Sequence, residues 1–124
     1  MKTKQRESFR PFAPSVLDEC AGEYFNLDIP SPYMLLTAEV REERRKKLPD
    51  NYSDMGLWEK LYCDRSDIQP CTHIDFSARI QTVSEDVNPK YRQLIKAFRE
   101  ITGYGLVVNT SFNVRGEPIV CTPD

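Results

Sequence analysis

Residues 74–81 read Ile-Asp-Phe-Ser-Ala-Arg-Ile-Gln, and apolar and polar side chains alternate strictly along them. A period of two is typical of a β-strand with one face on the core and one polar face. We expect this strand to cover residues 74–83. Its polar face would carry Asp75, Ser77, Arg79 and Gln81.

The next helix and strand are also well marked in the sequence. Asn88 suits an N-cap, Pro89 suits the first helical position, and Gly103 is a natural C-terminal stop. These signals predict a helix over 89–102, followed by a buried strand over 105–109. The apolar stripe of the helix would consist of Tyr91, Leu94, Ile95, Phe98 and Ile101.

The N-terminal third is expected to supply one helix and one strand. Ser15 suits an N-cap, and the apolar residues that follow it recur at helical spacing, so we expect a helix over 15–26. A nearly continuous apolar run predicts a well-buried strand over 33–40. The fold class is therefore predicted as α/β (α+β), a twisted mixed sheet with flanking helices.

The middle of the chain is harder to interpret. Residues 41–47 are strongly charged and predict a solvated surface helix in which the charge of Arg44 lies in water. Residues 48–69 show no clear period and are expected to form an excursion or a lid. Within it, Trp58, Leu61 and Tyr62 could pack a short helix onto the core.

Composition limits the classes of protein that the chain can represent. It has 124 residues, 17 basic and 19 acidic side chains and a net charge of -2, which fits one domain and argues against nucleic-acid binding driven by net charge. The sequence contains no apolar run of membrane-spanning length and no secretory signal pattern. With four cysteines, no Cys-x-x-Cys pair and one histidine, we expect reduced thiols, a cytoplasmic location and no metal site.

Three polar clusters could carry chemistry. The first spans residues 4–12, where Lys4, Arg6 and Arg10 share a parity in an extended segment. Three cations on one side could cradle a phosphate, because guanidinium groups form bidentate contacts with oxyanions. The alternative is an ordinary solvated basic terminus.

The second cluster spans residues 72–79. His73 is the only imidazole, and its placement beside the other polar residues of one strand makes a Ser-His-Asp triad geometrically poor, so a structural histidine is expected. Arg79 is a candidate anion ligand, with an ordinary surface pair to Asp75 as the alternative.

The third cluster spans residues 109–118 and directly follows the predicted strand 105–109. Asn109, Ser111, Asn113 and Arg115 would occupy a strand-end loop, where α/β proteins commonly hold ligands. Asparagine and serine are also common turn formers, so a purely structural loop is the alternative.

Several long motifs resemble those of the NodU/CmcH-type carbamoyltransferases, in the same order. Residues 4–15 resemble the family's K-x-R-E-x-F-R-P-F-A-P segment, and residues 31–34 resemble its S-P-Y-M strand. Residues 72–83 resemble T-H-V-D-x-x-A-R-x-Q-T-V, and residues 109–124 resemble the C-terminal signature that begins N-T-S-F-N. The segment 41–70 fits less well.

The resemblance implies that residues 1–124 are a single, partial C-terminal domain with a YrdC-like fold, truncated at both ends. Such a domain binds carbamoyl phosphate and ATP, with Mg²⁺ expected alongside the nucleotide, and forms a carbamoyl-adenylate for transfer to a hydroxyl acceptor. The family's actin-like N-terminal domain, which holds a metal ion and receives the acceptor, would be absent. The fragment alone is therefore expected to be an incomplete transferase.

By motif, the resemblance places catalytic roles on Arg79, Asn113 and Arg115. Substrate-binding roles fall on Lys4, Arg6, Arg10, Asn109 and Ser111. The guanidinium groups of Arg10, Arg79 and Arg115 are expected to converge on one pocket. Two other functions are kept open, a YrdC-like RNA-binding module and a non-catalytic fragment that docks onto an actin-like partner.

Overall fold

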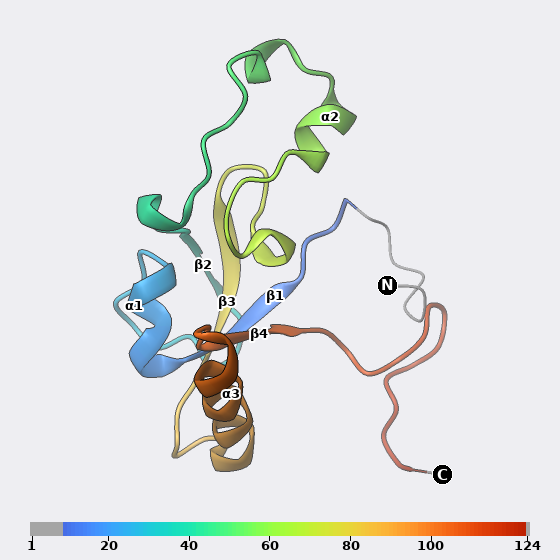
Figure 1. Cartoon of the computed structure of the whole chain (residues 1–124). Coiled ribbons are helices and arrows are strands. Elements are labelled where there is room, and N and C mark those ends of the chain that lie inside the picture. Colours follow the sequence, from blue (N-terminus) through green and yellow to red (C-terminus); the bar gives the residue numbers. More distant parts are fainter. Residues whose placement is uncertain (1–8, 124) are drawn as a thin grey trace.

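The computed structural model describes residues 9–123, which form a four-stranded mixed sheet with flanking helices (Figure 1). The strand order is β2-β3-β1-β4, which confirms the predicted fold class. The strands are β1 (Ala13–Leu17), β2 (Leu36–Glu39), β3 (Ser77–Val83) and β4 (Leu106–Asn109). The helices are α1 (Ala21–Tyr24), α2 (Leu57–Tyr62) and α3 (Pro89–Thr102).

Strand β1 lies inside the sheet, where the sequence predicted the start of a helix. It runs parallel to β3, with Ser15 opposite Gln81, and antiparallel to β4. Every residue of β1 is buried. A strand buried on both faces has no polar alternation, so the pattern of a strand was missing and the prediction of a helix over 15–26 is wrong for residues 15–17. Only a 3₁₀ turn at Asp18–Cys20 and the short α1 are helical.

The predicted strand 33–40 is shorter and more exposed than expected. β2 covers only Leu36–Glu39 and pairs only with β3, at the edge of the sheet. Tyr33 and Leu35 are 78% and 81% exposed. The preceding turn is nevertheless anchored, because Ser31 donates its Oγ hydrogen to the carbonyl of Ile80 at 2.8 Å. An apolar run thus did not signify burial here.

Helix α3 begins and ends where the sequence predicted. The side chain of Asn88 accepts a hydrogen bond from the Tyr91 amide at 3.1 Å, and Gly103 ends the helix with a φ of 81°. The helix packs against β1 and β4. From the predicted stripe only Ile95 is fully buried, whereas Leu94, Phe98 and Ile101 are exposed.

The charged segment 41–47 is not a solvated helix. It contains one 3₁₀ turn at Glu42–Arg44, and Arg44 is engaged on several sides. Its guanidinium lies 4.5 Å from the centre of the Tyr24 ring and pairs with Asp67 at 2.8 Å. The expectation that the charge of Arg44 lies in water is therefore wrong.

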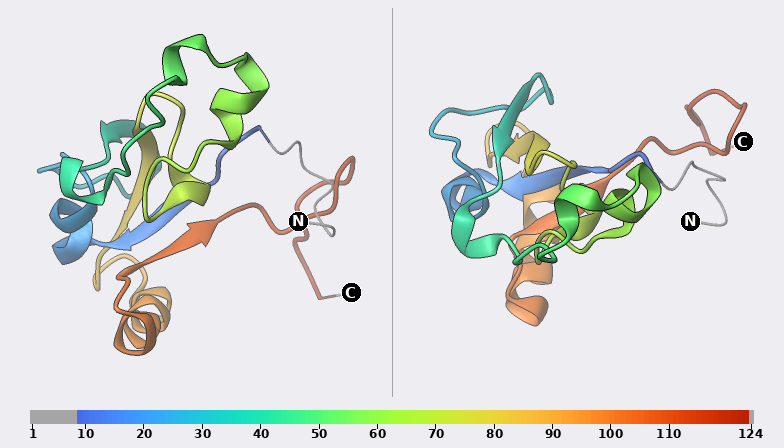
Figure 2. Two further views of the ribbon diagram at one scale, coloured as in Figure 1. Left: turned by 45° about the horizontal axis from the view of Figure 1, so that its top comes forward. Right: turned by 90° about the horizontal axis from the view of Figure 1, so that it is seen from above.

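Residues 48–69 form an excursion that stands away from the sheet (Figure 2). The expected short helix exists as α2, but Trp58 and Tyr62 are exposed and do not pack onto the core. The segment returns to the sheet through Ile68 and Cys71, which are both buried.

A single apolar cluster joins β1, β3, α1 and α3. Tyr24 of α1 is fully buried, and its hydroxyl accepts a hydrogen bond from the Gly105 amide at 2.8 Å, just before β4. A Cβ at position 105 would lie 2.9 Å from the sulfur of Cys20, so only glycine fits this approach. Within residues 9–123, no helix is both long and apolar enough to cross a membrane.

Candidate functional site

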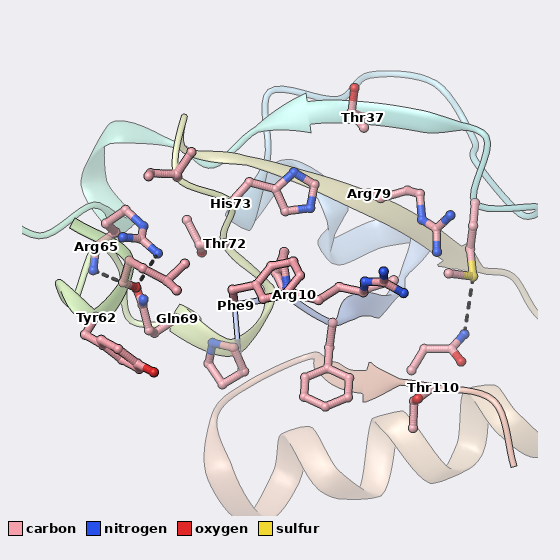
Figure 3. A pocket seen from close by; sticks show the side chains of 18 of the residues that line it. Phe9, Arg10, Thr37, Tyr62, Arg65, Gln69, Thr72, His73, Arg79 and Thr110 are labelled. Atoms are coloured by element: carbon pink, nitrogen blue, oxygen red, sulfur yellow. Dashed lines mark hydrogen bonds between the residues drawn. The ribbon is translucent and has the colours of Figure 1, made fainter. Parts of the chain in front are cut away.

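An open groove of about 1240 Å³ lies where the N-terminal segment, β3, the end of β4 and the excursion meet (Figure 3). Residues 9–13 and 109–111 line two of its sides. Arg79, Thr72 and His73 line it from β3 and the turn before it, and Leu61, Tyr62, Arg65 and Gln69 line it from the excursion. Three of the predicted clusters thus reach one surface.

Arg10 reaches the groove because the N-terminal segment is tied to the excursion. The Phe12 amide donates to the carbonyl of Pro70 at 2.8 Å, which fixes the approach of the chain to β1. Arg10 is exposed and lines the groove. It makes no ion pair with any residue in the described part of the chain.

Arg79 lies on β3, opposite Thr37 of β2, and also lines the groove. The alternative of a surface pair with Asp75 does not hold, because Asp75 instead accepts hydrogen bonds from the amide and hydroxyl of Ser77. Over residues 9–123, Arg79 has no ion-pair partner either. Figure 3 shows Arg10 and Arg79 reaching toward the same space. Two guanidinium groups that have no counter-ion among residues 9–123 therefore share one groove.

Arg65 is a third cation at the groove, and the sequence analysis did not identify it. Only 3% of the Arg65 residue is exposed to solvent. Its terminal nitrogens donate to the carbonyls of Lys60 and Leu61, at the end of α2, at 2.6 and 3.2 Å. Its buried Nε has no hydrogen-bond partner in the described part of the chain. Arg65 thus holds α2 against the groove and adds positive charge beneath it.

Asn109 is held at the rim by a polar ladder across three strands. Gln81 Oε1 accepts hydrogen bonds from Ser15 Oγ at 2.6 Å and from Asn109 Nδ2 at 2.7 Å. Gln81 Nε2 in turn donates to the carbonyl of Pro32 at 3.2 Å. Gln81 is therefore a positioning residue that sequence reasoning placed on the polar face of β3 but did not assign to the site.

The loop after β4 places the remaining predicted residues differently. Ser111 lines the groove, whereas Asn113 and Arg115 do not. The chain after β4 runs away from the sheet (Figure 1). Asn113 is occupied within that loop, accepting from Ser111 Oγ at 2.7 Å and donating to the carbonyl of Glu117 at 2.8 Å. Of the three guanidinium groups expected to converge, those of Arg10 and Arg79 line the groove and that of Arg115 does not. Lys4 and Arg6 lie outside the described residues.

The electrostatic character of the groove is one-sided. Arg10, Arg65 and Arg79 line it, and no aspartate or glutamate is among its described lining residues. The arrangement suits a ligand with several negative charges, because preorganised guanidinium groups make directional, charge-assisted hydrogen bonds to oxyanions. The described residues contain no cluster of three or more metal-ligating side chains.

The cysteines do not take part in this site. Cys20 and Cys71 are buried, and burial raises the pKa of Cys71 to about 12 and that of Cys20 to about 11. Both thiols are therefore protonated at neutral pH and are poor nucleophiles.

Comparison with known families agrees with the motifs and the groove. Residues 1–124 match the family model described as the carbamoyltransferase C-terminus, so the chain belongs to this family. A Synechocystis sp. protein described as uncharacterized is 58% identical over 124 residues, which are 100% of this chain and 20% of that protein. The nodulation protein NolNO of Sinorhizobium fredii is 41% identical over 94% of this chain and 15% of its own length.

A relative with a named reaction is similar too. The 3'-hydroxymethylcephem-O-carbamoyltransferase of Amycolatopsis lactamdurans is 36% identical over 94% of this chain and 18% of its own length. The chain thus spans about a fifth or less of the length of these relatives.

Proposed function

We propose that this chain is the carbamoyl-activating part of an O-carbamoyltransferase and that its groove binds carbamoyl phosphate and ATP. The observation that carries the proposal is the pair Arg10 and Arg79, two cations without ion-pair partners in the described part of the chain, on a groove whose described lining has no carboxylate. Both substrates are polyanions, so they match this charge. Membership in the carbamoyltransferase family supports the same reaction class.

In this proposal the protein contributes positioning and charge neutralisation. A carbamate oxygen, freed from carbamoyl phosphate when water takes up the phosphate, bonds to the α-phosphorus of ATP, and pyrophosphate leaves with the oxygen of the broken bond. Arg10 and Arg79 would hold the phosphate oxygens, and Asn109 would support them from the rim. Arg115 and Asn113 would act from the loop after β4, and Lys4 and Arg6 from the N-terminal segment.

The described lining of the groove offers no carboxylate to a Mg²⁺ ion that accompanies ATP. Mg²⁺ prefers oxygen ligands and often keeps several waters. Because no described carboxylate lines the groove, the ion would be held by phosphate oxygens and water. The arginines would then bind the complex of ATP and Mg²⁺ through the remaining phosphate oxygens.

The partner we propose is the actin-like domain of a longer carbamoyltransferase, which would supply the metal ion and the hydroxyl acceptor. The exposed apolar row of Leu94, Phe98 and Ile101 on α3 is consistent with such a partner, since an uncovered row of this kind is typical of an interaction surface. We also propose a cytoplasmic location, which the four free thiols support.

Titration calorimetry with the purified chain tests the ligand assignment. We expect ATP and carbamoyl phosphate to bind, and we expect Arg10→Ala to weaken both. Lys96→Ala is the matched control, because Lys96 is an exposed cation on α3, away from the groove. Binding that is unaffected by Arg10→Ala, or absent for both ligands, would remove the proposed function. Binding of RNA in place of both ligands would favour the RNA-binding alternative.

A further inference from the structure

The turn before β3 holds His73 in a hydrogen-bonded chain that the proposed function does not use. His73 Nδ1 lies 2.9 Å from Ser77 Oγ, and Ser77 Oγ lies 2.7 Å from Asp75 Oδ1. The turn is closed by the His73 amide, which donates to the Ser77 carbonyl at 2.8 Å. Phe76 adopts a φ of 64°, an uncommon value for a residue with a side chain, which shows how tightly this turn is defined.

This chain of contacts fixes the proton on the imidazole. A serine hydroxyl has one hydrogen, and a carboxylate can only accept, so the short contact to Asp75 requires Ser77 to donate there. Ser77 Oγ must then accept from His73, which places the ring proton on Nδ1. In the neutral ring Nε2 is therefore an unprotonated acceptor.

The environment of the ring keeps it neutral and directs it to the groove. Burial is the main cause that lowers the pKa of His73, and the nearby charge of Arg79 lowers it further, while Asp75 acts in the opposite direction. His73 lines the groove, and Figure 3 shows its ring turned toward the space that Arg10 and Arg79 also face. No hydrogen bond to a described residue occupies Nε2.

We propose that His73 Nε2 is a specificity-determining acceptor that recognises an amino group on the phosphorylated ligand, and that Ser77 and Asp75 are its positioning residues. This inference rests on the proposed function. Carbamoyl phosphate carries one hydrogen-bond donor, its NH₂ group, and otherwise only acceptors. Arginine side chains offer donors alone, so they can hold the oxygens but cannot recognise the NH₂ group. Acetyl phosphate, with a methyl group in its place, leaves His73 Nε2 without a partner.

Comparing the two ligands on the wild-type chain tests the inference directly. We expect carbamoyl phosphate to bind roughly three- to tenfold more tightly than acetyl phosphate, the effect of one net hydrogen bond. Equal binding would overturn the role of His73 and leave the anion site of the proposed function intact. If neither ligand binds, the proposed function fails, and this inference falls with it.

Two substitutions at His73 separate its two nitrogens. His73→Asn keeps a group at the position of Nδ1 for Ser77 and loses the acceptor at Nε2, so we expect the preference for carbamoyl phosphate to disappear. His73→Gln places an amide oxygen near the position of Nε2 and should retain the preference. Asn109→Ala, which removes an amide at the rim, should weaken both ligands alike. A preference that survives His73→Asn would overturn the inference.

A measurement on the unmodified chain covers the case in which a variant does not fold. The sequence has one histidine, so its imidazole nitrogen-15 signals need no assignment to a residue, and only Nδ1 and Nε2 have to be distinguished through their couplings to the ring hydrogens. We expect a protonated Nδ1 and an unprotonated Nε2 at neutral pH. A proton on Nε2 would refute the proposal, because that nitrogen would then be a donor.

Discussion

Replacing Arg79 with alanine is expected to weaken ATP binding without loosening the fold. The side chain makes no ion pair among the described residues, and the backbone pairing of Arg79 with Thr37 does not depend on it. A hydrogen bond to a charged group contributes about 1.5–3 kcal/mol. Arg79 is exposed, so the lower part of that range applies, about 1.5–2 kcal/mol, which raises Kd roughly 13- to 30-fold.

Arg79→Lys separates the charge from the geometry. Lysine retains the positive charge but cannot form the planar, bidentate contact of a guanidinium, so we expect an effect between those of wild type and Arg79→Ala. Titration calorimetry with ATP at constant ionic strength measures Kd, and thermal unfolding followed by circular dichroism checks the fold. Lys96→Ala again controls for the loss of one positive charge.

Three results would refute the reasoning about Arg79. The first is an equal, small loss of affinity in Arg79→Ala and Lys96→Ala, which would mean that only net charge matters. The second is full affinity in Arg79→Lys, which would deny the bidentate contact. The third is a large drop in the unfolding temperature of Arg79→Ala, which would assign the side chain to stability.

Three further expectations concern stability. Arg44→Ala should lower the free energy of unfolding by about 1–3 kcal/mol in urea denaturation, because it removes an ion pair at 2.8 Å and a cation–π contact; an unchanged midpoint would contradict this. Gly105→Ala should cost about 1–3 kcal/mol, because the new Cβ would meet the Cys20 sulfur at 2.9 Å, and adding Cys20→Ala should relieve part of that cost; strictly additive effects would count against the clash. The hydrogen bond between Glu19 and Arg92 is the main cause that lowers the pKa of Glu19 to about 2 from an ordinary 4.5. The contribution of Glu19 to the free energy of unfolding is therefore present above pH 4.5 and is lost as the pH falls toward 2. Glu19→Gln should flatten the pH dependence of unfolding in that window, by under about 1 kcal/mol because the group is partly exposed; an identical profile for both proteins would show that the pair contributes nothing.

The elements that the sequence predicted well are those whose signals are local. The cap at Asn88 and the stop at Gly103 gave both ends of α3, and the parity of Ala78 and Ile80 held in β3. The predicted start of that strand at residue 74 is wrong, because the His73 amide closes a turn onto the Ser77 carbonyl and β3 begins only at Ser77. β1 was missed because its burial on both faces depends on strands that lie far away in sequence. No local pattern distinguishes such a strand from part of a helix.

The residues of the site also divide into those that local motifs predicted and those that depend on contacts between distant segments. Arg10 and Arg79 belong to motifs that the sequence displays, and both line the groove. Arg65 lies in a stretch without periodicity, and its burial arises from contacts with the end of α2. The central role of Gln81 depends on the register of three strands, which only the folded chain reveals.

The position of β1 between β3 and β4 has a consequence during synthesis. Leu17, the last residue of β1, is synthesised 92 residues before Asn109, the last residue of β4. At about 5–20 residues per second, this apolar strand waits roughly 5–20 s for its second neighbour. Until then β3 and β4 cannot enclose it, and a nascent chain that stalls before residue 106 would present an unpaired edge to other chains. The order of translation therefore makes the first strand the last to be protected, and chaperone capture is most useful at this stage.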